Sequence, residues 1–531
     1  MQPLNHSHRW DMLIRGGTVV DGTGAPPFTA DVAIRADRIC AVSKQLPGEA
    51  RVTVDACDCL VCPGFIDAHS HSDAYLLLDP LSPSKVMQGI TTEVIGQCGA
   101  SAAPLLGRAR LPGDWRRFTY PGKWRTFADY RSLLEDVGPA VNVRPFVGHN
   151  TLRGCVTGYD PRPADAAELA RMQRLLAEAM DQGAAGLSSG LAYPPGRYAA
   201  VEELIELTRV VAERGGVYSV HLRNESGRLA ESISEVLRVA SLAGVCLEIS
   251  HLKIGGGATS AVLDRALQAI ERYRADGLRV AADAYPYTAS ASDLDIILPE
   301  YVFSRGPEHE LNLLWDPRWR ARITRELEKN LQTCDCKRII ISTTVDPANR
   351  RFRGKSLLEA AGMLDKSPAE TVIHLLITDR LATQAVFAGL RQDDIERILR
   401  LSYVCIGTDA SLRSPRGLLA DDHPHPRAYG TFPRFLRMCL DGLLPLAEAV
   451  RKMTGLPAAH FGLTDRGRVR SGAFADLCII EREVVRDRAT YREPHRFPQG
   501  IKAVIVNGVL TVEEGKLTGR RGGRILALQG D

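Results

Sequence analysis

The chain has 531 residues, of which 45% are hydrophobic and 24% are charged, and its formal net charge is +4. These values are ordinary for a globular protein and exclude wholesale disorder, and so slight a charge gives no reason to expect a nucleic-acid partner. No stretch approaches the ~20 apolar residues of a membrane span. The first twelve residues show no secretory leader, so we expect a cytoplasmic protein whose twelve cysteines are reduced thiols.

Both ends of the chain show the two-residue period of β-strands. Near the N-terminus we predict a pair of short strands in residues 12–20, broken at Gly16 and Gly17, a hairpin in 31–42 and a strand in 51–55. Near the C-terminus the β pattern returns in 475–480 and 501–510, where Asn507-Gly508 predicts a hairpin turn. The two segments together predict one small discontinuous β-sandwich domain, built from residues 9–62 and 468–531.

Between residues 63 and 467, short apolar runs alternate with amphipathic helices. Clear helices are predicted over 167–182 and 201–214. The runs predicted as strands are 64–69, 91–95, 141–147, 184–188, 217–221, 245–251, 278–285 and 403–409. Eight such runs interleaved with helices favour an α/β fold with a closed (β/α)8 TIM-like barrel over an open sheet. Residues from about 292 to 400 break the alternation, with a charged helix (319–331) and two short strands (338–343, 385–390), and predict an insertion between the last two barrel strands.

Residue types that bind metals recur at the ends of the predicted strands. They are His69 and His71 after the first strand, Cys98 after the second, His221 at the fifth, His251 at the sixth and Asp409 at the eighth. Any one of them could be a polar turn residue or a satisfied interior residue, but such a coincidence at five strand ends is not expected. The carboxyl ends of barrel strands meet at one rim, where imidazoles and a thiolate suit zinc and a carboxylate suits proton transfer.

These residues also fit a known family. Residues 63–73 (PGFIDAHSHSD) resemble the signature motif of the amidohydrolase superfamily, and the cysteine in 89–99 (GITTEVIGQCG) is similar to the D-aminoacylase, or N-acyl-D-amino-acid deacylase, branch. Further stretches resemble the same branch: 190–196 (GLAYPPG), 221–225 (HLRNE), 283–288 (DAYPYT) and 423–432 (HPHPRAYGTF). The resemblance extends over the whole chain, and Gln97 and Ala410 depart from it where the family usually has Asn and Gly.

The resemblance implies two metal positions at the predicted rim. The ligands implied for a tightly bound Zn²⁺ are Cys98, His221 and His251, and a weaker second position is implied near His69, His71 and Asp409, with Cys98 able to contribute to both. Many relatives bridge their metals with a carbamylated lysine. The only lysine that we place at a strand end is Lys253, which favours the cysteine variant instead.

The resemblance and the residues together predict zinc-dependent hydrolysis of N-acyl-D-amino acids, a small-molecule substrate class, with release of a carboxylate and a free D-amino acid. Zinc lowers the pKa of a bound water toward about 7, and we expect Asp409 to act as general base and acid. The resemblance places Tyr193 at the oxyanion and assigns the substrate carboxylate to Arg427, Lys253 and Tyr285. In the alternative interpretation Arg427 pairs with Asp421 or Asp422, Lys253 is solvated and Tyr285 is a core residue.

Two other functions share some of these sequence features. A cyclic-amide hydrolase of the hydantoinase or dihydroorotase kind shares the barrel and the signature motif, but Cys98 and the sequence 425–427 (HPR) argue against it. A non-catalytic scaffold would be expected to have lost metal ligands, whereas the full set is present. Asp293 and Asp295 would disfavour an acidic substrate side chain if they faced the pocket.

Overall fold

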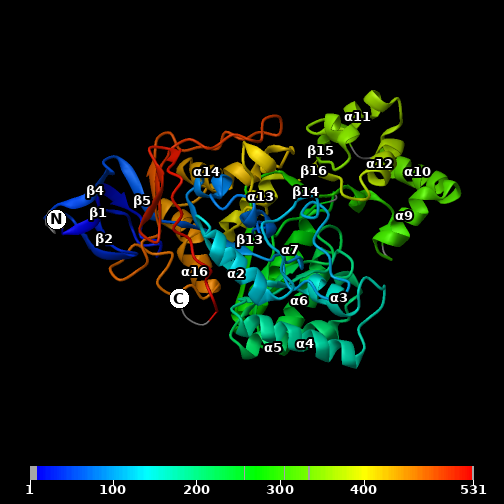
Figure 1. The fold of residues 1–531 in the computed structure, drawn as a ribbon, viewed down its shortest axis with the longest axis horizontal. Coiled ribbons are helices and arrows are strands. Elements are labelled where there is room, and N and C mark those ends of the chain that lie inside the picture. The colour runs from blue at the N-terminus through cyan, green and yellow to red at the C-terminus, as the bar shows by residue number, and fades with distance from the viewer. Residues whose placement is uncertain (1–8, 256, 304, 333–334, 529–531) are drawn as a thin grey trace.

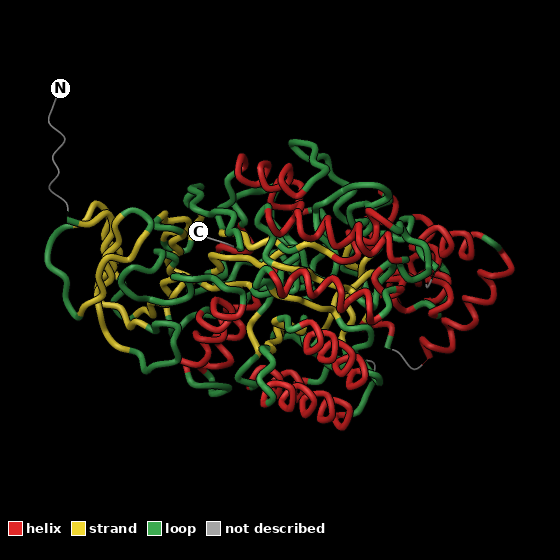
Figure 2. The backbone as a smooth tube through the Cα atoms, turned by 90° about the horizontal axis from the view of Figure 1, so that it is seen from below, coloured by secondary structure: helices red, strands yellow, loops and turns green. Residues whose placement is uncertain are grey.

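A computed structural model describes residues 9–255, 257–303, 305–332 and 335–528 of the chain. The terminal strands gather at one end of an elongated molecule, the strand–helix region fills the middle, and a helical segment lies at the opposite end (Figures 1 and 2). Among the described residues, no helix is long and apolar enough to cross a membrane. The eleven described cysteines are free thiols, and the twelfth, Cys334, lies outside the described residues.

Strands from both ends of the chain form one nine-stranded sheet. Its order is β21-β20-β19-β18-β5-β1-β2-β3, with β4 paired to β1. The strands are β1 (Trp10–Val19), β2 (Phe28–Arg35), β3 (Arg38–Ser43), β4 (Ala50–Asp55), β5 (Cys59–Pro63), β18 (Leu477–Glu481), β19 (Ile501–Val506), β20 (Val509–Glu513) and β21 (Lys516–Leu517). The two chain ends meet where β18 pairs antiparallel with β5, with Leu477 opposite Pro63. Residues 529–531 of the predicted terminal domain lie outside the described part.

Glycine positions decide two details of this sheet. The prediction of two strands in 12–20 is wrong, because β1 is a single strand whose pairing with β2 shifts register between Ile14 and Gly17. Gly16 has φ 70° and donates its N–H to the Asp31 carboxylate at 2.9 Å, so a β-bulge absorbs the glycines without ending the strand. The hairpin at Asn507-Gly508 is confirmed, with both residues at positive φ between the paired strands β19 and β20.

Each of the eight runs predicted as barrel strands contains a strand. They are β6 (Phe65–Asp67), β7 (Ile90–Ile95), β8 (Asn142–Pro145) with β9 (Val147–Gly148), β10 (Gly186–Gly190), β11 (Val217–His221), β12 (Cys246–Ile249), β13 (Val280–Ala284) and β17 (Val404–Ile406). They pair in parallel in two sheets, β17-β13-β12-β11-β10-β9 and β6-β7-β8. Only Phe146 separates β8 from β9, so the two sheets meet at that run.

Helices follow these strands along the chain. The predicted helices at 167–182 and 201–214 are confirmed as α4 (Ala166–Asp181) and α5 (Val201–Glu213). Asp165 caps the N-terminus of α4, and its carboxylate accepts the N–H of Glu168 in a capping box. The other helices of this region are α1 (Pro83–Val86), α2 (Phe127–Val137), α3 (His149–Val156), α6 (Leu229–Ala243), α7 (Ser260–Ala275), α13 (Gln392–Arg400), α14 (Arg427–Leu440), α15 (Leu446–Met453) and α16 (Gly455–His460).

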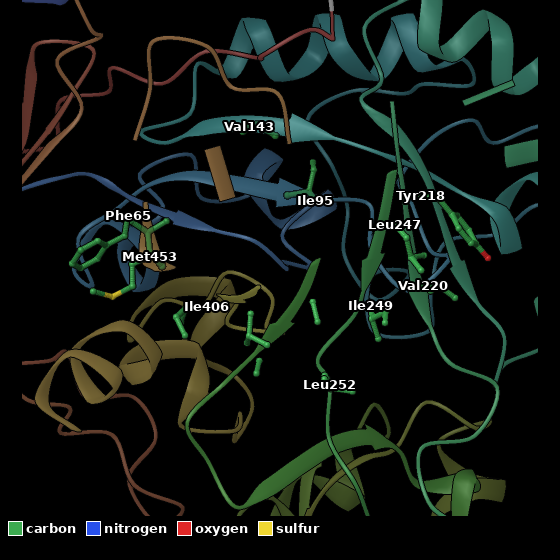
Figure 3. Packing of buried hydrophobic residues seen from close by; sticks show 14 of the residues in the cluster. Phe65, Ile95, Val143, Tyr218, Val220, Leu247, Ile249, Leu252, Ile406 and Met453 are labelled. Atoms are coloured by element: carbon green, nitrogen blue, oxygen red, sulfur yellow. The ribbon is translucent and has the colours of Figure 1, made fainter. Parts of the chain in front are cut away.

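The largest buried cluster lies between the parallel strands and these helices. Figure 3 shows Val220 of β11 close to Leu247 and Ile249 of β12 within it. Burying one such side chain stabilises the fold by about 1.5–3 kcal/mol. Successive residues of a strand point to opposite faces, so while Val220 packs outward, the next residue, His221, faces the other side of the sheet.

Residues 294–385 carry a separate apolar core. It packs against a three-stranded antiparallel sheet of β14 (Ala289–Asp293), β16 (Gln384–Ala388) and β15 (Ile339–Thr343). Its helices are α8 (Glu300–Phe303), α9 (Pro307–Trp315), α10 (Pro317–Gln332), α11 (Leu357–Leu364) and α12 (Pro368–Thr378). This unit lies within the range of about 292–400 that was predicted as an insertion, and α13, at the end of that range, buries Ile395 and Ile398 in the large cluster instead.

Candidate metal centre

The six predicted metal ligands come together at the carboxyl ends of the parallel strands. His69 and His71 follow β6, Cys98 follows β7, His221 ends β11, His251 follows β12 and Asp409 follows β17. Four of them, His69, His221, His251 and Asp409, are at most 7% exposed. Residues from five strands therefore surround one small volume, as expected because the carboxyl ends of parallel strands lie on the same side of a sheet.

Cys98 is at the centre of the cluster. Its Sγ lies 3.3 Å from His69 Nε2 and 3.3 Å from His251 Nε2. The Nε2 of His251 also lies 2.9 Å from His221 Nδ1. Three imidazole nitrogens thus gather around one sulfur, and His221 presents Nδ1 where His69 and His251 present Nε2.

Asp409 lies on the side of His69 and His71. Its Oδ1 is 3.2 Å from His71 Nε2 and 3.5 Å from His69 Nε2. Its Oδ2 forms an ion pair with Arg427 Nη1 at 2.7 Å. Arg427 therefore does not pair with Asp421 or Asp422, which bind Arg353 and Arg413 instead.

Three residues of the cluster have a left-handed backbone. The φ angles are 53° at Cys98, 35° at His251 and 47° at Asp409. L-residues rarely adopt such angles, which cost of the order of 1–3 kcal/mol each and persist where the surrounding structure enforces them. Strain of this kind is concentrated at functional sites, and here it turns the side chains inward just after their strands end.

A buried network of charged and polar groups joins the turns that carry His69 and Asp409. Lys85 Nζ donates to Asp67 at 2.8 Å, to Thr408 Oγ1 at 3.0 Å and to the Ala410 carbonyl at 2.9 Å. Asp67 in turn accepts the N–H of Thr408 at 2.7 Å. The side chains of Lys85 and Asp67 are fully buried. Each compensates the charge of the other, which would be very costly to bury without a partner.

The electrostatics of the cluster favour a thiolate and a carboxylate. Burial opposes ionisation of Cys98, but His69 and His251 hold its pKa well below the ordinary value. Burial likewise opposes ionisation of Asp409, and the adjacent Arg427 holds its pKa well below the usual range. Thiolates and carboxylates are the ionised forms that ligate metals.

The four predicted substrate-binding residues surround the same volume. The Tyr193 ring lies 4.7 Å from that of His221, and the Arg427 guanidinium lies 4.7 Å over the Tyr285 ring. Lys253 Nζ lies 2.9 Å from His251 Nδ1. Tyr193, Lys253, Tyr285 and Arg427 are thus all near the cluster, with cationic groups on two sides of it.

Two carboxylates outside the set of predicted site residues also contact the histidines. Asp283 Oδ2 lies 3.0 Å from His69 Nδ1, and Glu225 Oε1 lies 3.0 Å from His251 Nδ1. Asp283 lies near the carboxyl end of the predicted strand 278–285, a position that could have marked it. Glu225 is in the loop after β11, four residues beyond His221, where only its presence in the HLRNE stretch gave a signal.

The donor set fits a metal ion such as zinc. Ligand atoms of His69, Cys98, His251 and Asp409 all lie within 4.8 Å of one another, as do those of His221, Glu225 and His251. Among the described residues these are the only such groups. A thiolate with imidazoles and a carboxylate is the ligand mixture that zinc prefers.

Comparison with known proteins agrees with this chemistry. The model of the amidohydrolase family matches residues 52–512. The chain is 36% identical to D-aminoacylase of Alcaligenes xylosoxydans xylosoxydans over 98% of both chains. It is 35% identical to the N-acyl-D-glutamate deacylase of the same organism, over 97% of this chain and 96% of the relative.

Solved structures give the same picture. A crystal structure of D-aminoacylase superposes with a TM-score of 0.83 at 36% identity, covering 98% of this chain and all of the other. The N-acyl-D-glutamate deacylase of Bordetella bronchiseptica, complexed with zinc and a phosphonate mimic of the tetrahedral intermediate, gives 0.82 at 31% identity over 98% and 99% of the chains. A D-hydantoinase at 15% identity and a TM-score of 0.56 shares the fold alone.

Proposed function

The chain belongs to the amidohydrolase family, in the branch of D-aminoacylase and the N-acyl-D-amino-acid deacylases, and on that basis we propose that it is a zinc-dependent enzyme that hydrolyses the amide bond of N-acyl-D-amino acids. Its products are a carboxylate and a free D-amino acid. The observation that carries the proposal is the convergence of one thiolate and three imidazoles beside a buried carboxylate, Asp409.

We assign the tightly bound zinc ion to Cys98, His221 and His251. A second, weaker position would be held by His69, His71 and Asp409, with Cys98 shared between the two. When bound, zinc would polarise the amide carbonyl and make a water molecule nucleophilic near neutral pH.

Asp409 is the proposed general base and acid. Arg427 keeps its carboxylate ionised, so it can accept a proton from the attacking water and deliver it to the departing nitrogen. Tyr193 would donate a hydrogen bond from its hydroxyl to the oxygen that becomes negative as the carbonyl is attacked, since burial raises the pKa of Tyr193 well above the ordinary value and keeps the hydroxyl protonated.

The substrate carboxylate is assigned to Arg427, Lys253 and Tyr285. The Arg427 guanidinium offers a planar pair of donors that matches a carboxylate, and the Tyr285 ring beneath it holds that plane in place. Lys253 and the Tyr285 hydroxyl add donors from the neighbouring strand ends. A fixed anchor for the carboxylate would orient the scissile amide toward Asp409.

Two features of the fold complete the proposal. We infer that the parallel sheets close into a (β/α)8 barrel over residues 63–467, since Ala68 N–H donates to the Ile406 carbonyl at 3.2 Å and places β6 beside β17. Inward residues such as Val94, Val217 and Cys246 form a buried cluster of their own, as a barrel interior would. The terminal strands enclose one shared core, which supports a β-sandwich of residues 9–62 and 468–531.

A panel of linear and cyclic amides tests this function. We expect amine release from N-acetyl-D-amino acids and no ring opening of hydantoin or dihydroorotate. Ring opening without turnover of linear amides would favour the cyclic-amide hydrolase instead. A protein that binds no zinc and hydrolyses neither class would be a scaffold.

A further inference from the structure

Glu225 lies between a proposed zinc ligand and a proposed substrate anchor. Its Oε1 is 3.0 Å from His251 Nδ1, and its carboxylate is 2.7 Å from Lys253 Nζ. Lys253 Nζ is itself 2.9 Å from His251 Nδ1. Glu225 and Lys253 therefore meet at the same ring nitrogen of His251, which can form a hydrogen bond with only one of them.

The position of Cys98 decides which nitrogen of His251 must carry the proton. His251 Nε2 faces Cys98 at 3.3 Å, so ligation of a metal there requires Nε2 without a proton and Nδ1 with one. The Nδ1–H needs an acceptor, and an ammonium group has none. Glu225 supplies the acceptor, whereas Lys253 alone would donate to Nδ1 and leave the proton on Nε2.

We propose that Glu225 is a positioning residue that fixes the tautomer of His251 and prevents Lys253 from donating to the same nitrogen. The metal ligand and the substrate anchor are thereby held together by one carboxylate. This inference rests on the proposed zinc-dependent function and extends it. The Oε2 of Glu225 also lies 3.9 Å from His221 Nε2, on the side of that ring away from Cys98.

His69 provides an internal comparison. Its Nδ1 lies 3.0 Å from Asp283 and its Nε2 lies 3.3 Å from Cys98, which is the arrangement seen at His251. Carboxylates that hold the distal nitrogen of a ligating histidine typically change metal affinity 10–100-fold when removed. Among the described residues no lysine or arginine forms an ion pair with Asp283, so only at His251 does a cation compete for the nitrogen.

Direct ligation by Glu225 is the main alternative. Glu225 contacts the Nδ1 side of His251, while Cys98 contacts the Nε2 side, and one ion cannot bind both sides of an imidazole ring. An ion on the Nδ1 side would also meet the Lys253 ammonium, which lies within 3 Å of both Glu225 and that nitrogen.

The test measures the zinc dissociation constant by chelator competition on the full-length protein. We expect Glu225→Leu to weaken zinc binding 10–100-fold and Glu225→Leu/Lys253→Met to recover part of that loss, because the competing donor is gone. Glu225→Gln, which keeps an acceptor of the same length, should lose less than Glu225→Leu and serves if the leucine variant does not fold. Glu235→Gln, which removes a nearby carboxylate paired with Arg223, should bind zinc like the wild type.

Wild-type zinc affinity in Glu225→Leu would overturn the proposal. So would a double variant that binds zinc no better than Glu225→Leu, since a direct ligand or a purely structural residue would give no rescue. Zinc affinity is measured without substrate, so the outcome of this test does not depend on which amides the protein hydrolyses. Wild-type protein that binds zinc but does not cleave N-acetyl-D-amino acids would defeat the proposed function and leave the role of Glu225 to be decided by the variants.

Discussion

The guanidinium of Arg427 forms an ion pair with the carboxylate of Asp409 at 2.7 Å. The proposed carboxylate anchor and the proposed base therefore touch, and both are at most 7% exposed. Arg427 is the first residue of α14, and Asp409 follows β17. The contact allows binding of the substrate carboxylate to change the charge around the base.

Replacement of Asp409 should abolish proton transfer while leaving the fold intact. We expect Asp409→Asn to lower kcat by about 10²–10⁴-fold, because an amide cannot accept the proton of the attacking water. Steady-state kinetics with zinc-loaded protein measures this. Asp441→Asn, at an exposed ion pair with Arg437, is the matched control and should keep wild-type turnover. Wild-type kcat in Asp409→Asn would remove it from the mechanism.

Removal of the central thiol should release the metal. We expect Cys98→Ala to lose stoichiometric zinc on dialysis, because its sulfur lies between two imidazoles of the cluster. Metal analysis of the dialysed protein measures the zinc content. Cys57→Ala, at an exposed thiol, should retain full zinc, and full zinc in Cys98→Ala would show that the sulfur is not a primary ligand.

The anchor role of Arg427 predicts a dependence on the substrate carboxylate. Arg427→Lys should lower kcat/KM for N-acetyl-D-methionine by an order of magnitude or more, since an ammonium lacks the planar pair of donors. For N-acetyl-D-methioninamide, which has no carboxylate, the loss should be much smaller. Equal losses of kcat/KM on the two substrates would show that Arg427 acts only through its ion pair with Asp409 and does not bind the substrate carboxylate.

The position and charge of Asp293 predict which substrate side chains the protein prefers. It is exposed at the end of β14, next to Ser292, whose Oγ lies 3.5 Å from the Tyr193 hydroxyl, and it contributes to the raised pKa of Tyr193. Its negative charge should disfavour acidic side chains. We expect N-acetyl-D-glutamate to be a poorer substrate than N-acetyl-D-methionine, and Asp293→Asn to raise kcat/KM for the glutamate several-fold. Glu308→Gln, at an exposed site on α9, should change neither value, and an unchanged preference in Asp293→Asn would contradict the prediction.

The lowered pKa of Glu203 predicts how the stability of the fold depends on pH. Burial alone would raise the pKa of the Glu203 carboxyl. His149, at 2.7 Å, and the adjacent Arg153 outweigh this effect and lower the pKa to about 2. The pKa is therefore lower in the folded protein than in the unfolded chain, so the stabilisation, about 3 kcal/mol, is complete above about pH 5 and is lost as the pH falls toward 2. Urea unfolding of zinc-free protein should show a deficit for Glu203→Gln that is constant from pH 7 to 5 and about 1 kcal/mol smaller at pH 4. A deficit that does not change with pH would contradict the assignment.

The strand-end rule predicted most of the site from sequence. His69, Cys98, His221, His251 and Asp409 each end or follow a run with a clear β pattern, and parallel strands bring such ends together whatever the details of packing. The rule could not find the partner of Arg427, because Asp421 and Asp422 are nearer in sequence than Asp409 and only the tertiary structure separates them.

Other features depend on contacts that no local pattern encodes. Glu225 lies in a loop, and its proposed role follows from its contacts with His251 Nδ1 and Lys253 Nζ, two groups far from it in sequence. Gly16-Gly17 suggested a strand break, but a hydrogen bond to Asp31 converts it into a bulge. The helix α13 is rich in charged residues, like the insertion before it, but its apolar residues Ile395 and Ile398 pack in the large buried cluster.

The most direct test compares initial rates on the two enantiomers of N-acetylmethionine, before chelation, after chelation and after zinc is restored. We predict amine release from the D enantiomer at a rate far above that from the L enantiomer, its loss on chelation and its recovery with zinc. Activity that survives full removal of the metal, or that favours the L enantiomer, would contradict the assignment of this chain as a zinc-dependent N-acyl-D-amino-acid deacylase.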